Sequence, residues 1–372
     1  MKHARHLLIL VFLFAVLPVQ SQTPSTAADY VNRGNLRYRQ SDYDGAIADY
    51  DKAIEIDPRH AEAYYNRGRA RKAKGNLDGA IVDYDKYISL GPTNSKYLAD
   101  GYNNRGNARR AKGDLAGAIS DLTKAIEIDP HHAVAYNSRG LALKEKGDPD
   151  GAIPDYSKAI EIDPGYASAY HNRGNARQAK KDLEGAIADY SKAIAIDPRE
   201  PETYYNRARA RRARGDLDGA IADDDIYISL NRTNPKYLAD GYYNRGLTRE
   251  AKGDLDGAIA DYMRTIEIDR LYADAYNDLA WLLATASGDP IRDGKKAVYY
   301  SRKAAELTKW ERANILDTLA AACAEAGNFD EAIKWENKAL SFQEFARSSG
   351  DEARKRLQLY TERKPYHEPP PK

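Results

Sequence analysis

The sequence predicts an all-α fold, a solenoid of stacked helix pairs. Its 372 residues exceed what a single hydrophobic core usually organises. One tract recurs along most of the chain, and each copy contains two stretches of apolar residues with helical spacing. Charged residues make up 30% of the chain, but Ala, Leu, Ile and Tyr recur evenly, which is not typical of a disordered polymer.

The N-terminus differs from everything that follows it. Lys2 and Arg5 form a basic start, and residues 7–17 are an unbroken apolar run, shorter than the ~20 residues of a membrane span. We therefore expect residues 1–21 to be a signal peptide and residues 22–26 to be a linker. This expectation places the mature chain in the periplasm or outside the cell. The alternative is an uncleaved N-terminal membrane anchor.

Charge and cysteine usage exclude several classes of protein. The net charge of +1 becomes −1 without residues 1–21, because Lys2 and Arg5 leave with them. A near-neutral body argues against binding to nucleic acid. The single cysteine, Cys323, rules out a disulfide framework or a thiolate metal cluster and is expected to be a buried apolar residue.

The repeat has a period of 34 residues with two longer steps of 38. A small residue follows an arginine or leucine in each copy, at Gly34, Gly68, Gly106, Gly140, Gly174, Ala208, Gly246 and Ala280. Because the 38-residue step occurs twice, a larger block of 140 residues has been duplicated, and Lys96–Tyr102 returns unchanged as Lys236–Tyr242. We expect the four extra residues to change the local pitch of the array. The alternative is that they form ligand-binding loops.

Within one copy, two helices are separated by a tight turn. In residues 61–92, Tyr64, Gly68 and Arg71 mark one helical face before Gly75 ends the first run. Asn76, like Asp114, Asp216 and Asp254 in other copies, is a typical N-cap for the second helix. A lone helix pair cannot bury its apolar stripe, so neighbouring copies must stack.

These residues resemble the tetratricopeptide repeat, with Tyr64, Gly68, Ala80, Tyr84 and Pro92 at its characteristic positions. The resemblance covers about residues 27–346 and implies a right-handed superhelical solenoid of about nine units. It also implies a capping helix at 347–361 and a disordered tail at 362–372. The expected units begin near Ala27, Ala61, Ala99, Ala133, Ala167, Pro201, Ala239, Ala273 and Ala313.

Charged residues stand at positions that should lie between helices. Seven of the predicted first helices carry an arginine at the same site. The second helix of each of these units carries an aspartate at a fixed site. An inter-helix charge is costly unless it is paired, so we expect an Arg–Asp ladder covered by tyrosine rings. The alternative is an anion-binding stripe. The pairs are Arg33–Asp49, Arg67–Asp83, Arg105–Asp121, Arg139–Asp155, Arg173–Asp189, Arg207–Asp223 and Arg245–Asp261.

The resemblance also implies that first helices line a concave groove. Aromatic and arginine residues at the exposed sites are typical of interaction hot spots, and the basic stretches favour an acidic partner. The alternative is a solvated face with no single ligand. The candidate groove residues are Tyr65, Arg69, Lys72, Asn103, Asn107, Arg110, His171, Asn175, Tyr205, Arg209, Arg212 and Tyr243.

The sequence contains no nucleotide-binding, protease or hydrolase motif and no metal-ligand spacing, so we expect no enzyme activity, cofactor or metal. Trp281 and Trp310, in the irregular eighth unit, are expected to be packing residues. The leading hypothesis is an extracytoplasmic scaffold that binds a peptide or partner protein. The alternative is a non-catalytic targeting subunit of an envelope enzyme complex, for example a glycan-modifying one.

Overall fold

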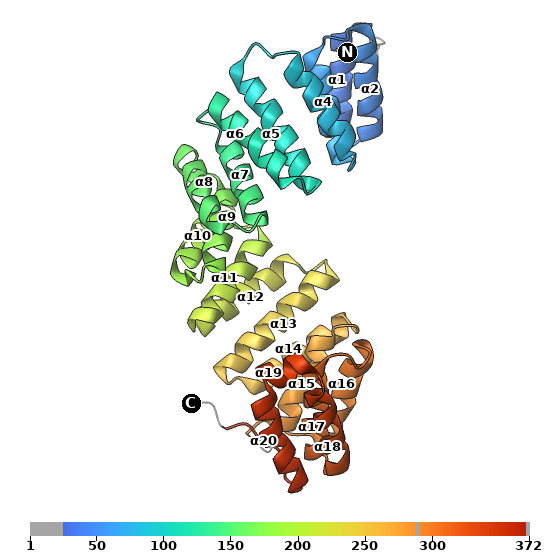
Figure 1. The fold of residues 1–372 in the computed structure, drawn as a ribbon, viewed down its shortest axis with the longest axis vertical. Coiled ribbons are helices and arrows are strands. Elements are labelled where there is room, and N and C mark those ends of the chain that lie inside the picture. Colours follow the sequence, from blue (N-terminus) through green and yellow to red (C-terminus); the bar gives the residue numbers. More distant parts are fainter. Residues whose placement is uncertain (1–24, 288–289, 370–372) are drawn as a thin grey trace, which may run out of the picture. The chain divides into compact units, whose positions relative to one another are not determined.

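A computed structural model describes residues 25–287 and 290–369, and every regular element within them is an α-helix (Figure 1). The described part divides into two compact units, residues up to 135 and residues from 136, with the boundary inside one helix. Each unit is described by itself. The predicted signal peptide 1–21, most of the predicted linker 22–26 and residues 370–372 lie outside the described residues.

Unit 1 is a row of helix pairs in which each helix packs against the next along the chain. Its helices are α1 (Ala27–Arg39), α2 (Tyr43–Ile56), α3 (Ala61–Ala73), α4 (Leu77–Ser89), α5 (Ser95–Ala111) and α6 (Leu115–Ile128).

Unit 2 continues the same pattern from Tyr136, inside α7. Its helices are α7 (Ala133–Glu145), α8 (Pro149–Ile162), α9 (Ala167–Ala179), α10 (Leu183–Ile196), α11 (Pro201–Arg214), α12 (Leu217–Leu230), α13 (Pro235–Lys252), α14 (Leu255–Ile268), α15 (Ala273–Thr285), α16 (Gly294–Leu307), α17 (Ala313–Glu325), α18 (Phe329–Leu340), α19 (Gln343–Ser348) and α20 (Gly350–Thr361).

The two 38-residue steps lengthen the helices that follow them. Helix α5 begins at Ser95 and α13 at Pro235, four residues before the starts expected from the repeat. They are 17 and 18 residues long, whereas α3 and α9 have 13. The extra residues therefore add about one helical turn to the N-terminal end of each first helix. Thr93, Asn94, Thr233 and Asn234 lie in the connection before each lengthened helix, so the alternative of a ligand-binding loop stays a prediction.

The N-caps explain a glycine that the repeat places in the first turn of the second helices. Asp42 caps α2 by accepting a hydrogen bond from the Gly45 amide at 2.9 Å, and Asn76 caps α4 through Gly79 in the same way. A Cβ atom at Gly45 would lie 2.1 Å from the Asp42 carboxylate. The glycine therefore leaves room for the capping side chain, and the predicted N-caps are confirmed.

A second set of glycines lets tyrosine rings pack against the backbone. Tyr84 is fully buried, and a Cβ atom at Gly68 would lie 2.9 Å from its ring. The same contact recurs between Tyr190 and Gly174, where the distance would be 2.6 Å. Such rings are core residues of five repeats, and any larger side chain at the glycine must displace them.

The predicted Arg–Asp ladder is confirmed in all seven repeats. Each aspartate is between 1 and 6% exposed, and its arginine binds both carboxylate oxygens through Nε and Nη2. A tyrosine ring lies 5.2–5.8 Å from each guanidinium carbon. In six repeats a second arginine one turn later binds the same aspartate. With its carboxylates fully paired, the ladder has a structural role and is not a free anion-binding stripe.

The C-terminal end differs from the expected single cap and free tail. Two helices, α19 and α20, stand where one helix at 347–361 was predicted. Helix α20 packs on α18 and α17, with Tyr360 fully buried and Arg356 Nη2 2.6 Å from Asp317 Oδ1. Residues 364–369 form no helix, but they contact other residues of unit 2. This part of the tail that was predicted to be disordered is therefore ordered.

Removing one ladder aspartate tests how much the Arg–Asp ladder contributes to the stability of the fold. We expect Asp83→Ala to lower the free energy of unfolding by about 3 kcal/mol, because Arg67 and Arg71 lose a carboxylate that is 1% exposed. The matched control is Asp85→Ala, whose carboxylate is 49% exposed and pairs with Arg105, and its cost should stay below about 1 kcal/mol. Chemical denaturation followed by circular dichroism measures both. Equal costs would contradict a buried ladder.

Candidate functional site

The twelve predicted groove residues fall into two sets of six, one in each unit. We call each set, with the first-helix surface around it, the first-helix face of that unit. The face of unit 1 comprises Tyr65, Arg69, Lys72, Asn103, Asn107 and Arg110, and that of unit 2 comprises His171, Asn175, Tyr205, Arg209, Arg212 and Tyr243.

Tyr65 anchors the face of unit 1. Its ring lies 4.9 Å from that of Tyr87 and 6.1 Å from that of Tyr84, and its hydroxyl accepts a hydrogen bond from Asn104 at 2.8 Å. The exposed Arg69 guanidinium lies 4.8 Å from the centre of the Tyr38 ring. An arginine held over an aromatic ring is pre-organised for contact with a partner.

Three cations of this face lie close together. Burial lowers the pKa of Lys72, and the positive charges of Arg110 and Arg69 lower it further. Because like charges in one place repel, an incoming carboxylate or other anion would relieve this repulsion.

Asn103 does not contribute an accessible side chain. It is 5% exposed, and its backbone carbonyl accepts a hydrogen bond from Asn107 Nδ2 at 3.0 Å. The equivalent residues Val31 and Asn137 are also buried, so the shorter side chains at this site of the first helix are covered.

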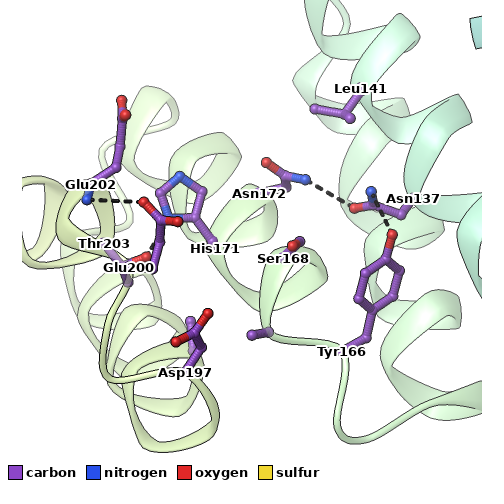
Figure 2. Close-up of a pocket in the computed structure, with 12 residues that line it drawn as sticks. Asn137, Leu141, Tyr166, Ser168, His171, Asn172, Asp197, Glu200, Glu202 and Thr203 are labelled. Atoms are coloured by element: carbon purple, nitrogen blue, oxygen red, sulfur yellow. Dashed lines mark hydrogen bonds between the residues drawn. The ribbon is translucent and has the colours of Figure 1, made fainter. Parts of the chain in front are cut away.

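His171 lines a pocket of about 420 Å³ between α7, α9 and α11 (Figure 2). Its Nδ1 lies 2.8 Å from Thr203 Oγ1. Burial, with a smaller effect of the Lys144 charge, lowers the pKa of His171 to about 4. The imidazole is therefore neutral at pH 7 and offers a hydrogen bond, not a charge.

The same pocket contains side chains that the sequence analysis did not select. Asn172 Nδ2 donates to Asn137 Oδ1 at 2.9 Å, and Asn137 Nδ2 donates to the Tyr166 hydroxyl at 3.3 Å (Figure 2). An asparagine directly before the ladder arginine recurs in most repeats, which was the available signal: Asn32, Asn66, Asn104, Asn172, Asn206 and Asn244.

Tyr205 and Arg209 stand at the sites of Tyr65 and Arg69, but Arg209 lies over Tyr205 of its own helix, whereas Arg69 lies over Tyr38 of the preceding repeat. The Tyr205 ring lies 5.3 Å from that of Tyr227, and the exposed Arg209 guanidinium lies 5.6 Å from the Tyr205 ring. The Asn175 side chain binds within its own repeat, where it accepts a hydrogen bond from the Tyr190 hydroxyl at 2.7 Å.

Unit 2 contains one repeat in which the glycine–tyrosine contact is replaced. Ala208 replaces the glycine and Asp224 replaces the core tyrosine. Thr248 replaces the small residue that packs on the tyrosine ring in other repeats. Asp224 is 1% exposed and accepts from Thr248 Oγ1 at 3.2 Å, but its Oδ1 has no hydrogen-bond partner. Burial raises the pKa of Asp224 to about 7, although Arg212 acts in the opposite direction.

Tyr243 belongs to an acidic region at the C-terminal end of this face. Its hydroxyl donates to Asp278 at 2.8 Å, and the Tyr262 hydroxyl donates to Glu250 at 2.5 Å. Burial raises the pKa of Glu250 to about 7, opposed by the Tyr262 hydrogen bond, and the charges of Asp278 and Glu368 raise it further.

The chain's own C-terminal segment occupies this region. Trp281 Nε1 on α15 donates to Glu368 Oε1 at 2.9 Å, and the Glu368 amide donates to the Thr285 carbonyl at 2.7 Å. The Tyr366 ring lies 6.2 Å from that of Trp281. Trp281 packs against the hydrophobic core of unit 2, as expected, and it also binds the non-helical C-terminal segment. Trp310 packs as well, stacked 5.0 Å from Trp335.

Within the described residues, no three His, Cys, Asp or Glu side chains are arranged to hold a metal ion. Over the same part of the chain, no helix combines the length and apolarity of a membrane span. Cys323 is buried as expected, and burial raises the pKa of its thiol to about 11.

Family models match much of the chain. A model described as TPR repeat matches residues 34–75, 106–147, 140–181 and 174–211, and one described as tetratricopeptide repeat matches residues 61–94 and 239–270. No curated protein matches the chain.

Solved structures of repeat proteins are also similar. MamA is 30% identical over 44% of this chain and 94% of its own, with a TM-score of 0.40. YrrB, described as a TPR protein with an unusual peptide-binding site, is 30% identical over 46% of this chain and 87% of its own, with a TM-score of 0.38. The C-terminal part of a TPR repeat-containing protein from Cytophaga hutchinsonii is 19% identical over 67% of this chain and 99% of its own, with a TM-score of 0.52, and it shares the fold.

The raised pKa of Asp224 predicts a pH dependence of stability. The folded chain keeps a proton on this carboxyl up to a pH of about 7, whereas the unfolded chain loses it near the ordinary aspartate pKa of 3.8. Its contribution to stability is therefore present below pH 4 and is lost as the pH rises to 7. We expect Asp224→Asn to flatten the dependence of the denaturation midpoint on pH in this window. A variant with the same slope as the unaltered chain would contradict this.

The docked C-terminal segment predicts binding in trans. A chain ending at Arg363 should bind a peptide of residues 364–372, with a change in tryptophan fluorescence, because Trp281 and Thr285 are then free. The full-length chain should bind the peptide more weakly, because its site is filled. A peptide carrying Glu368→Gln should bind about tenfold more weakly to the truncated chain, since a charged acceptor is lost.

A scrambled peptide of the same composition is the control for this measurement. Equal binding of the scrambled and native peptides would show that the docking site does not recognise the segment.

Proposed function

The chain belongs to the tetratricopeptide-repeat family, whose members are protein–protein interaction scaffolds, and we propose that it holds an extended segment of a partner on its first-helix faces outside the cytosol. The location rests on the basic and apolar character of residues 1–21. The proposal assigns no reaction to the chain, since scaffolds of this family are typically non-catalytic.

The observation that carries this proposal is the docked C-terminal segment. Residues of α15 supply an indole N–H to the Glu368 carboxylate and a carbonyl to its amide, with Tyr366 beside Trp281. Trp281 occupies the same site of its repeat as Arg69 and Arg209. A face that binds a non-helical segment of its own chain at this site has the hydrogen-bonding groups to bind one from a partner.

The charges of the face favour an acidic partner segment in unit 1. Arg69 and Arg110 lie close enough to Lys72 to lower its pKa, in addition to the effect of burial, and Arg69 is exposed. A partner carboxylate placed among them would gain charge-assisted hydrogen bonds and also relieve that repulsion.

Reversing one exposed charge in each unit tests the proposal. Immobilised chain with Arg69→Glu and Arg209→Glu should retain at least about tenfold less partner from an envelope extract than the unaltered chain. The matched control is Arg59→Glu with Arg199→Glu, which makes the same change of charge at exposed inter-repeat turns in each unit.

Circular dichroism of both variants shows whether they remain folded. A partner held equally by both variants, or lost equally from both, would contradict recognition by the first-helix faces.

A further inference from the structure

A pocket of about 610 Å³ in unit 1 is lined by three tyrosines and two carboxylates. It lies between α3, the end of α4 and the extra turn that begins α5. The side chains that define it are Tyr65, Tyr87, Tyr97, Glu62 and Asp100, and we call it the tyrosine pocket. No lysine or arginine is among its lining residues.

The 38-residue step creates this pocket. Tyr87 stands where other repeats carry a small residue such as Ala53 or Ala125, and its hydroxyl donates to the Tyr97 carbonyl at 3.0 Å. The extra helical turn of α5 brings Tyr97 to the rim, where the side chain is 59% exposed. A large aromatic side chain left this accessible beside the buried Tyr87 ring and the half-buried Tyr65 ring provides a surface for a ligand.

The electrostatic environment of the pocket is negative. Burial raises the pKa of Tyr87, and Tyr65, Asp100, Tyr97 and Glu62 all raise it further. Glu62 is exposed, and Asp100 is 42% exposed with one oxygen 3.1 Å from His132 Nε2. Aromatic faces and carboxylates together attract an organic cation.

The duplicated block preserves these groups in unit 2. Residues 140 positions later are Glu202, Tyr205, Tyr227, Tyr237 and Asp240, and the Tyr205 and Tyr227 rings lie 5.3 Å apart at 41°. Here Asp240 accepts from the Tyr272 hydroxyl at 3.1 Å, in the role that His132 has in unit 1.

The second copy differs at its rim. Gly91 and Pro92 of the first copy become Asn231 and Arg232, so this copy carries a cation of its own nearby. An incoming cation would be repelled there, and the unit 1 pocket is therefore the stronger of the two.

We propose that the tyrosine pocket binds an organic cation, the guanidinium or ammonium group of a side chain on the bound partner. The proposal rests on the proposed function in one respect, that the cation belongs to a partner segment. It adds a recognition element of opposite charge to the basic cluster of Arg69, Lys72 and Arg110, so the favoured segment carries an acidic and a basic residue.

Titration of the full-length chain with small molecules tests whether the tyrosine pocket binds an organic cation. N-acetylarginine methylamide, tetramethylammonium and the uncharged N-acetylcitrulline methylamide are titrated at constant ionic strength, with 1H–15N NMR spectra as the readout. We expect the arginine derivative to shift resonances of residues 87–100 and the citrulline derivative to leave them unchanged. Equal effects of these two compounds, or no effect of either, would overturn the proposal.

Substitution of lining residues tests whether the arginine derivative binds in the tyrosine pocket. Tyr97→Ala and Glu62→Gln should each weaken the arginine derivative at least about fivefold, because one removes an aromatic face and the other a negative charge. Tyr299→Ala, which removes an equally exposed tyrosine from α16, is the matched control and should have no effect. Unchanged binding in Tyr97→Ala would overturn the assignment.

The two cations distinguish the sources of the ligand. Stronger binding of the arginine derivative supports a partner side chain, whereas stronger binding of tetramethylammonium would overturn it in favour of a free quaternary ammonium compound. These measurements involve neither Arg69 nor Arg209, so the pocket and the proposed function can fail separately.

Discussion

The bidentate contact between a first-helix arginine and a buried second-helix aspartate is the interaction on which the repeat depends. In each repeat the arginine closes its own helix pair, and in most of them its Nη1 also reaches the preceding second helix, as Arg67 does to Asp51 and Arg173 to Ser157. A buried carboxylate without this partner would be strongly destabilising, so every repeat must supply both residues in one register. The tyrosine over each guanidinium adds a cation–π contact on the outer side.

This internal pairing determines what remains for recognition. The ladder uses the arginine just before the small glycine, and the glycine admits the core tyrosine. The exposed Arg69 and Arg209, which lie over tyrosine rings, stand at a different site of the first helix. The chain therefore separates structural from exposed positive charge by position within the repeat, and the repeat containing Asp224 shows that replacing the core ring leaves a carboxylate that titrates near neutral pH.

Much of the local structure could be predicted from residue spacing. The fixed register of arginine and aspartate predicted the ladder, because paired charges are the only inexpensive way to place them between helices. The N-caps were visible as Asp or Asn before the second helix. The lengthening of α5 and α13 and the burial of Asn103 were not, since they depend on where each helix begins and on what packs against it.

The sequence by itself determined the helix pairs, their period and the pairing of charges, because these are set by contacts within one repeat or between neighbours that recur every 34 residues. Only the tertiary structure decided which sites on the first helices stay accessible. The docking of Glu368 on Trp281, 87 residues away, and the meeting of Tyr65, Tyr87 and Tyr97 in one pocket depend on the lengths of particular helices and on the path of the chain after α20. Such contacts occur once or twice in the chain, and no periodic pattern encodes them.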